Sequence, residues 1–279
     1  MVMQALFRHN DVEASSAVAE EASPVFTMES ASLSIGGHTL LSPTSLSLRR
    51  GRVYGIIGHN GSGKSTLLKL LARQAQPSSG KILYAGTPVG ELGARAFARH
   101  VAYLPQQTPV TTGLTVRELV RFGRYPWHGP LGRISPTDHL CVAEALRLAQ
   151  VEDLADRLID TLSGGERQRA WIAMLVAQNS SFILLDEPTS ALDLAHQIEV
   201  LRLLQTLSRT RHLGVVAILH DINMAARFCD ELIALQRGQV RMQGKPDDLM
   251  RSDVLEMIYG IPMEVIRHPA AGAPIGFAR

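Results

Sequence analysis

The sequence predicts an α/β fold with a mainly parallel β-sheet. Three uninterrupted apolar runs of strand length predict it, because central parallel strands are covered by helices on both faces. The first run leads through a glycine-rich loop into an apolar-periodic helix, which is a typical strand–loop–helix unit. The three runs cover residues 53–57, 182–185 and 213–219.

The glycine-rich loop after the first run reads GHNGSGKS and fits the pattern G-x-x-x-x-G-K-[ST]. Glycines let the backbone wrap around phosphates with its N–H groups inward, and the next helix adds its positive dipole end. Lys64 would neutralise charge between the β- and γ-phosphates, and Ser65 would bind Mg²⁺. The alternative, an ordinary strand-to-helix turn with an incidental lysine, is disfavoured by the spacing and context. The predicted nucleotide-binding residues here are Gly58, His59, Asn60, Gly61, Ser62, Gly63, Lys64, Ser65 and Thr66.

Polar residues follow the other two runs directly. Asp186 and Glu187 end the second, and ligands collect at the carboxyl ends of strands in open α/β sheets. Asp186 is placed to bind Mg²⁺, and Glu187, one residue further out, to polarise an attacking water. His220 ends the third run, where it would hydrogen-bond a γ-phosphate oxygen and hold Glu187 in register. The structural alternatives are solvated turn acids and a capped or partly buried histidine.

A second loop, SGGE at residues 163–166, reads first as a capping box. Ser163 would cap the helix that begins there, while Glu166 reaches back. A capping box needs no paired glycines, however, and their missing side chains leave N–H groups open to an anion. Residues 58–66 already cradle one nucleotide. The second anion site therefore predicts a two-fold dimer, in which each Ser163 loop covers the γ-phosphate bound by the other copy.

In this order, the segments resemble the nucleotide-binding subunit of an ABC transporter over roughly residues 27–250. The resemblance implies an ABC-type P-loop NTPase with a RecA-like core, a small antiparallel β-subdomain and a helical signature subdomain. It implies an ATPase that uses ATP and Mg²⁺. The matching motifs are Walker A at 58–65, the Q-loop at Gln106, the signature at 162–166, Walker B at 182–187, the D-loop at 190–193 and the switch histidine His220.

The resemblance also implies a role for each motif residue. Gln106 would tie rotation of a helical lobe to the state of the nucleotide, because it lies where the two lobes join. The implied catalytic residues are Glu187, His220, Lys64 and Gln106, the metal ligands Ser65, Gln106 and Asp186, and the further nucleotide contacts Ser163, Gly164, Gly165 and Asp193.

A narrower resemblance is to the ATPases of siderophore and vitamin B12 importers, with the ferric hydroxamate importer as the closest likeness. It is carried by residues 121–129, 171–178, 220–227 and 258–263. It implies uptake of ferric hydroxamate siderophores through an integral membrane permease. The other implied partners are a second copy of the chain and, indirectly, a periplasmic siderophore-binding protein.

One departure from the family concerns the nucleotide base. The family usually stacks an aromatic residue on adenine, whereas this sequence aligns Ile35 at that point. An aliphatic side chain covers the ring with less stacking, so we expect His38 to be a second candidate for this contact.

Composition and charge limit the kinds of partner and the location that we expect for the chain. The chain has 279 residues, 46% hydrophobic, with a net charge of +2 and no basic cluster interleaved with aromatic residues, so no nucleic-acid partner is expected. Two cysteines indicate no disulfide framework. No apolar stretch reaches about 18 residues, and residues 1–11 lack the order of a secretory signal. We therefore expect a protein on the cytoplasmic face of the inner membrane, attached through the permease.

Composition and periodicity divide the chain into three parts. Residues 1–25 are expected to be a mobile tail, 26–250 an ATP-binding domain, and 251–279 a C-terminal appendage. Within the domain, Gly36 and Gly37 predict a hairpin turn, and residues about 107–165 a helical subdomain. The appendage is expected to be helical and to end in a Pro- and Gly-rich segment. Exposed contacts to the permease are expected at Arg121, Tyr125 and Trp127, with ordinary packing as the alternative.

Two other functions compete with the importer. A soluble ABC ATPase that works mechanically on nucleic acid or the ribosome would carry a long coiled-coil insertion or a second cassette, and the sequence has neither. A non-hydrolysing nucleotide switch is disfavoured by Glu187.

Overall fold

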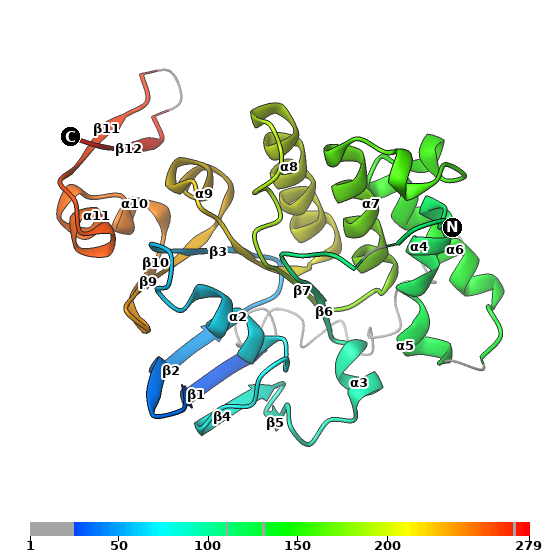
Figure 1. The fold of residues 1–279 in the computed structure, drawn as a ribbon, viewed down its shortest axis with the longest axis horizontal. Coiled ribbons are helices and arrows are strands. Elements are labelled where there is room, and N and C mark those ends of the chain that lie inside the picture. Colours follow the sequence, from blue (N-terminus) through cyan, green and yellow to red (C-terminus); the bar gives the residue numbers. More distant parts are fainter. Residues whose placement is uncertain (1–24, 110, 130–131, 270–271) are drawn as a thin grey trace, which may run out of the picture.

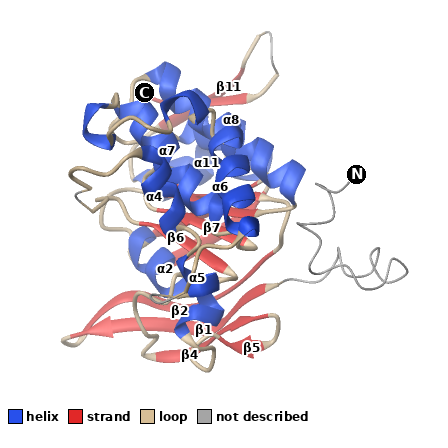
Figure 2. Ribbon diagram, turned by 90° about the vertical axis from the view of Figure 1, so that its right-hand side faces the viewer, coloured by secondary structure: helices blue, strands red, loops and turns tan. Residues whose placement is uncertain are grey.

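The computed structural model describes residues 25–109, 111–129, 132–269 and 272–279. The tail expected over residues 1–25 lies outside the described residues except for Val25. Two sheets and their helices are arranged in layers (Figure 1). In Figure 2 the four-stranded sheet lies at the bottom, with helix α2 above it, then the six-stranded sheet, and most of the longer helices beyond.

The six-stranded sheet contains the three predicted strands side by side. Its order is β10-β9-β3-β8-β7-β6, and all neighbours pair in parallel except β9 and β10. Every residue of β3, β7 and β8 is buried, as expected of strands covered on both faces. The bounds are β3 Val53–Ile57, β6 Val101–Leu104, β7 Phe182–Leu185, β8 Gly214–Ile218, β9 Glu231–Gln236 and β10 Gln239–Gly244.

The four-stranded sheet is antiparallel, in the order β2-β1-β4-β5. Gly36 and Gly37 form the predicted turn with φ of 57° and 80°, values that favour glycine. Helix α2 lies between this sheet and the other one, and Leu67, Leu68 and Leu71 are fully buried there. The bounds are β1 Phe26–Ile35, β2 His38–Leu48, α2 Lys64–Leu71, β4 Ser79–Tyr84 and β5 Thr87–Pro88.

The opposite face of the six-stranded sheet is covered by the remaining long helices. Side chains alternate along β7, so that Leu184 joins the core around α2 while Ile183 and Leu185 join the core around α7. Helices α4 and α6 lie within residues 107–165, where a helical subdomain is expected, and they pack against each other and against α7, most of which follows that range. The bounds are α3 Ala94–Ala98, α4 Val116–Phe122, α5 Tyr125–His128, α6 Pro136–Leu148, the 3₁₀ turns η1 Glu152–Leu154 and η2 Ile159–Thr161, α7 Gly164–Ala177, α8 Leu194–Arg211 and α9 Ile222–Phe228.

A buried ion pair fixes this helical part. Arg124 Nε donates to Asp138 Oδ1 at 2.8 Å, and both side chains are 6% exposed. Arg124 Nη1 also donates to the carbonyl of Ala177, at the end of α7, at 2.7 Å. Burial of Asp138 opposes ionisation, but its hydrogen bonds to Ser135 and Arg124 hold its pKa below the usual range. Because both charges are satisfied, removing one partner is expected to be more costly than removing both.

The C-terminal part differs from the helical appendage that the sequence predicts. Two short helices, α10 Pro246–Leu249 and α11 Ser252–Tyr259, are followed by an antiparallel hairpin of β11 Met263–Arg267 and β12 Pro274–Ala278. Asn223 of α9 holds the hairpin, since its amide accepts from Gly276 N at 2.8 Å and donates to Gly276 O at 3.1 Å. Strand pairing of this kind depends on a tertiary partner and leaves little trace in Pro- and Gly-rich composition.

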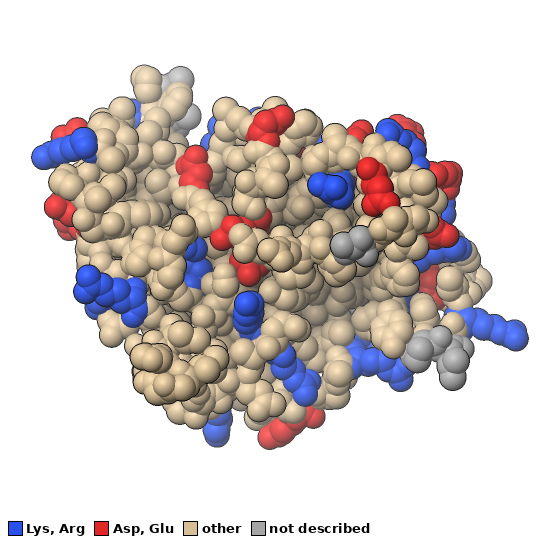
Figure 3. All heavy atoms as spheres, viewed as in Figure 1, with Lys and Arg blue, Asp and Glu red and all other residues tan. Residues whose placement is uncertain are grey.

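The surface and cysteines agree with the composition. Acidic and basic side chains are interspersed over the face in Figure 3 rather than separated by sign. Cys141 and Cys229 are both buried and unpaired. In the part of the chain that the structure describes, no helix combines the length and apolar character needed to cross a bilayer.

Candidate functional site

The glycine-rich loop connects β3 to α2 and is shaped by three glycines with positive φ: Gly58 at 143°, Gly61 at 78° and Gly63 at 101°. A Cβ atom at Gly58 would lie 2.2 Å from the carbonyl oxygen of Leu235, so only glycine fits there. Gly63 is the N-cap of α2 and provides no side-chain cap. The first N–H groups of α2 are therefore left for a ligand, as the phosphate-loop hypothesis expects.

Lys64 begins helix α2 and is buried, with 5% of its surface exposed. Its Nζ donates to the carbonyls of Gly58 at 2.8 Å and His59 at 3.0 Å, so the ammonium closes the loop on itself. Burial lowers the pKa of Lys64, while the nearby carboxylates of Glu187 and Asp186 oppose that effect. A cation held in this way is ready to exchange carbonyl partners for phosphate oxygens.

Ser65 and Asp186 meet at the end of β7, where Ser65 Oγ donates to Asp186 Oδ1 at 3.2 Å. Burial is the main cause that raises the pKa of Asp186, and the neighbouring Glu187 adds to it. A hydroxyl and a carboxylate are hard oxygen donors, so this pair fits Mg²⁺. Among the described residues, no group of three or more His, Cys, Asp or Glu could hold a metal. A cation here would therefore take its other ligands from phosphate oxygens and water.

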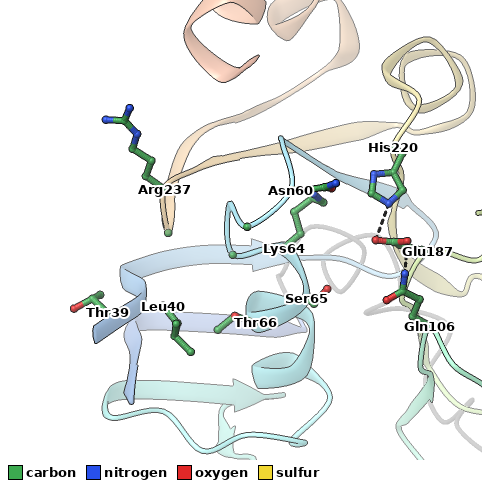
Figure 4. Close-up of a pocket in the computed structure, with 13 residues that line it drawn as sticks. Thr39, Leu40, Asn60, Lys64, Ser65, Thr66, Gln106, Glu187, His220 and Arg237 are labelled. Atoms are coloured by element: carbon green, nitrogen blue, oxygen red, sulfur yellow. Dashed lines mark hydrogen bonds and ion pairs between the residues drawn. The ribbon is translucent and has the colours of Figure 1, made fainter. Parts of the chain in front are cut away.

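Glu187 lies between two side chains that come from neighbouring strand ends (Figure 4). Its Oε1 is 2.6 Å from His220 Nε2, and its Oε2 accepts from Gln106 Nε2 at 2.7 Å. Glu187 has φ of 54°, which is uncommon for a residue with a side chain, and strain of this kind is concentrated at functional sites. The structure thus brings together Gln106, Glu187 and His220, as the strand-end rule predicts. Gln106 contacts Glu187 through nitrogen, which leaves its Oε1 available to a metal.

A cavity of about 750 Å³ joins Lys64, Ser65, Gln106, Glu187 and His220 into one site, and Asp186 lines the neighbouring cleft instead. The cavity reaches from the Glu187 group across the phosphate loop to the β1–β2 hairpin. Ile35 is 62% exposed and does not line the cavity, and neither does His38, whereas Thr39 and Leu40 do. The lining residues are Thr39, Leu40, Asn60, Gly61, Gly63, Lys64, Ser65, Thr66, Gln106, Glu187, His220, Arg237 and Gly238.

The sequence did not predict the turn between β9 and β10 as part of this site, nor Thr39 and Leu40 of β2. Gly238 N donates to the carbonyl of Ser62 at 2.9 Å, so the turn supports the phosphate loop from outside. Gly238 has φ of 72° and Arg237 has φ of 48°. A glycine shortly after the apolar run 232–235 signals such a turn. Nothing in the sequence says that it lies beside the loop.

The second loop forms the capping box that the sequence predicts. Ser163 Oγ accepts from Glu166 N at 3.3 Å, and Glu166 Oε2 accepts from Ser163 N at 2.8 Å. Gly164 lines a second cleft, of about 330 Å³, that shares Gln106 and Glu187 with the first. Ser163, Gly165 and Asp193 line neither cavity. Within one chain, the structure therefore does not bring the Ser163 loop to the phosphate loop.

Asp193 is the N-cap of α8. Its Oδ1 accepts from His196 N at 3.0 Å and lies 2.8 Å from His196 Nδ1. These hydrogen bonds hold the pKa of Asp193 below its usual range.

Comparison with known families decides the identity. Residues 41–190, which contain the phosphate loop, Gln106, the Ser163 loop and Glu187, match the family described as ABC transporter. This chain is an ABC transporter ATP-binding protein. The match confirms the predicted family and the ABC-type P-loop NTPase fold, and ABC ATP-binding proteins of this family are ATPases.

The ABC protein has relatives of nearly its own length. It is similar to the ferric enterobactin transport ATP-binding protein FepC of Escherichia coli (strain K12), with 40% identity over 88% of this chain and 91% of the relative. It is 36% identical to the iron(3+)-hydroxamate import ATP-binding protein FhuC of Bacillus subtilis (strain 168), over 88% of this chain and 92% of the relative.

A solved structure shares the fold of the ABC protein. It is the dimeric post-hydrolysis state of the ATP-binding cassette MJ0796 bound to ADP and Pi. The TM-score is 0.68 with 28% identity, over 79% of this chain and 98% of that chain.

Proposed function

We propose that this chain is the ATP-hydrolysing subunit of an importer for ferric siderophores, with hydroxamates as the cargo class. The observation that carries the catalytic part is the Glu187 carboxylate, fixed by His220 at 2.6 Å and Gln106 at 2.7 Å in the cavity that Lys64 lines. A base held by two partners needs little reorganisation before it orients and polarises water.

The residues of the phosphate loop would bind the nucleotide from one side. Backbone N–H groups of residues 58–66 receive the phosphate oxygens, and Lys64 neutralises the charge that develops on the γ-phosphoryl group. Glu187 orients the attacking water, and His220 keeps the carboxylate in register. Ser65, Asp186 and the Oε1 atom of Gln106 would hold Mg²⁺, which when bound neutralises charge on the phosphate oxygens.

We infer that the working unit is a dimer with the second copy in head-to-tail orientation. The Ser163 loop lies outside the cavity of its own chain, and Ser163 and Gly164 are both exposed. A second copy turned by a two-fold axis would present Ser163, Gly164, Gly165 and Asp193 to the bound γ-phosphate. The dimeric MJ0796 cassette supports such self-association.

Gln106 would couple the nucleotide to the helical lobe, residues 107–165. It lies between β6 and that lobe, and its amide holds the catalytic carboxylate. The permease would contact the exposed side of α4 and α5. Tyr125 is 47% exposed and Arg121 half-buried, whereas Trp127 donates from Nε1 to the carbonyl of Gln178 at 2.7 Å. Trp127 therefore has a packing role as well, and Tyr125 is the better probe of the permease contact.

The relatives support the proposed class of cargo and the proposed partners. FepC is named for ferric enterobactin transport and FhuC for iron(3+)-hydroxamate import, which supports an importer of iron chelates over an ATPase acting on nucleic acid or the ribosome. The partners would be an integral membrane permease at the cytoplasmic face of the inner membrane and, through it, a periplasmic siderophore-binding protein.

Uptake of labelled iron tests the proposal. Cells that carry the chain and the permease co-purifying with it should accumulate ⁵⁵Fe from a ferric hydroxamate, whereas Glu187→Gln should abolish accumulation without preventing assembly with the permease. Tyr125→Ala should retain ATP hydrolysis and weaken assembly. Ferric enterobactin serves as the control cargo. Undiminished ⁵⁵Fe uptake in the E187Q variant, or uptake of enterobactin alone, would contradict the catalytic or the cargo assignment respectively.

A further inference from the structure

The two glycines of the Ser163 loop have different surroundings. A Cβ atom at Gly164 would meet the nearest atom, Leu192 Cδ2, at 3.6 Å, an ordinary contact distance. A Cβ atom at Gly165 would lie 2.3 Å from Cδ2 and 2.7 Å from Cγ of His196. Gly164 is exposed and Gly165 is buried. Since neither has a positive φ, backbone conformation does not require glycine at either position, but packing does at Gly165.

The imidazole that packs on Gly165 is fixed from its other edge. His196 lies in the first turn of α8, and its Nδ1 is 2.8 Å from Oδ1 of Asp193, the N-cap residue. Hydrogen bonds from His196 hold the pKa of Asp193 low, so the carboxylate is ionised and Nδ1 is the donor. One side chain thus contacts both the end of the 190–193 loop and the start of α7.

Two neighbouring contacts reinforce this connection. Gln197 Nε2 donates to the carbonyls of Leu192 at 2.9 Å and Thr189 at 3.3 Å, which fixes the backbone of the 190–193 loop. Further along the helices, Arg169 of α7 pairs with Glu199 of α8 at 2.7 Å. The Ser163 loop and the 190–193 loop therefore lead into the first turns of α7 and α8, two helices that contact each other.

We propose that His196 is a positioning residue that sets the Ser163 loop and the 190–193 loop relative to each other. This inference rests on the proposed function, in which a second copy receives both loops against its bound nucleotide. Gly165 is then glycine because of His196, and Gly164 is glycine because the approaching nucleotide and second copy need the space. His196 acts through these loops and does not touch the nucleotide.

Separate titrations of nucleotide binding and dimerisation test the proposal in the Glu187→Gln background. A fluorescent ATP analogue at low protein concentration reports binding to the phosphate loop of single chains. Light scattering at high protein concentration reports the ATP-driven dimer. We expect His196→Ala to change single-chain binding by less than about twofold and to raise the ATP concentration for half-dimerisation about tenfold. A merely structural defect would weaken both and lower the melting temperature.

A suppressor experiment separates the reasons for the two glycines. Gly165→Ala should weaken dimerisation more than H196A does, because the methyl group displaces the imidazole. The double variant G165A/H196A should return to the level of H196A, since the clash is gone and alanine is a better helix residue than glycine. Gly164→Ala is the matched control, and adding H196A should not relieve its defect.

Three outcomes would contradict the proposal. Wild-type-like dimerisation of H196A, or a double variant G165A/H196A no better than G165A, would overturn the coupling while leaving the dimer in place. An E187Q parent that stays monomeric with saturating ATP would overturn the proposed dimer and the coupling with it.

Discussion

Helices α2 and α7 both begin at glycine-containing loops, but only α7 has a side chain that caps the N–H groups of its first turn. Helix α2 starts after Gly63 with no side-chain cap, and Ser62 Oγ is buried without a hydrogen-bond partner in the described part of the chain. Helix α7 starts at Ser163 with a complete capping box. The start of α2 therefore leaves its first N–H groups to a ligand, whereas the start of α7 is capped by Ser163 and Glu166 of the same chain.

This difference separates two kinds of binding site. The end of α2 carries the buried Lys64 and lines the cavity, so it can enclose phosphates within one chain. The end of α7 is exposed at Ser163 and Gly164, and the N–H groups of Gly164 and Gly165 precede the N–H of Glu166, which Ser163 Oγ caps. We therefore expect the α2 end to bind phosphates within one chain and the α7 end to act only against a second copy.

Lys64→Ala should have the largest effect, because it removes the buried cation at the end of α2. We expect kcat/KM for ATP hydrolysis to fall by roughly 10²–10³-fold, the usual cost of losing a preorganised charge partner. Phosphate release measures it. Lys69→Ala, on the exposed side of the same helix, is the control and should stay close to wild type. A similar loss in both variants would contradict the specific role of Lys64.

Asp186→Asn should reduce kcat by about 10²-fold and yet stabilise the protein without nucleotide. Burial raises the pKa of Asp186 above its unfolded value, so its stabilising contribution is complete below the unfolded pKa and is lost as pH rises through the folded pKa. At neutral pH the ionised carboxylate is then a cost. Thermal unfolding should show the variant about 1 kcal/mol more stable at neutral pH, and the difference should shrink as pH falls through the folded pKa.

Two serine substitutions should shift stability in opposite directions. Ser163→Ala removes a helix cap and should lower the free energy of unfolding by about 1 kcal/mol. Ser62→Ala removes a buried, unpartnered hydroxyl and should raise it by about 1 kcal/mol. Urea unfolding without nucleotide measures both. Equal signs would show that the two helix ends do not differ as the structure indicates.

Glu166→Gln should have the smallest effect and should be visible chiefly in its pH dependence. The hydrogen bond from Ser163 N holds the pKa of Glu166 below its ordinary value, so its contribution to stability is present at neutral pH and is lost as pH falls through the folded pKa. The stability difference between wild type and variant should therefore shrink in acid. Glu118 has the same arrangement with Thr115, so Glu118→Gln is the matched control. It should reproduce the acid profile and leave ATP-driven dimerisation unchanged.

Much of the site could be predicted from the sequence because its chemistry is local. The phosphate loop needs Gly58, Gly63 and Lys64 at fixed spacing, and the capping box needs only four consecutive residues. The meeting of Glu187 with His220 follows from adjacent parallel strands, which end at one edge of the sheet.

The remainder depends on contacts between distant segments. Gly238 supports Ser62, and His196 packs on Gly165, although neither pair is close in sequence. The β11–β12 hairpin is held by Asn223 on another element. Ile35 is the residue that the sequence predicts at the nucleotide base, yet the cavity is lined by Thr39 and Leu40 of β2, because hairpin geometry decides which side chains face inward. The hydrophobic periodicity of the sequence carries no information about contacts between such distant segments.

The mass of the Glu187→Gln protein in solution, with and without ATP, shows whether the α7 end of one copy completes the site of another. Size-exclusion chromatography with light scattering should give twice the 30.4 kDa chain mass with ATP and the single chain mass without it. Adding Gly164→Ala should return the ATP-bound sample to the single mass. A protein that binds ATP and remains at 30.4 kDa would contradict the claim that the α7 end completes the site of another copy.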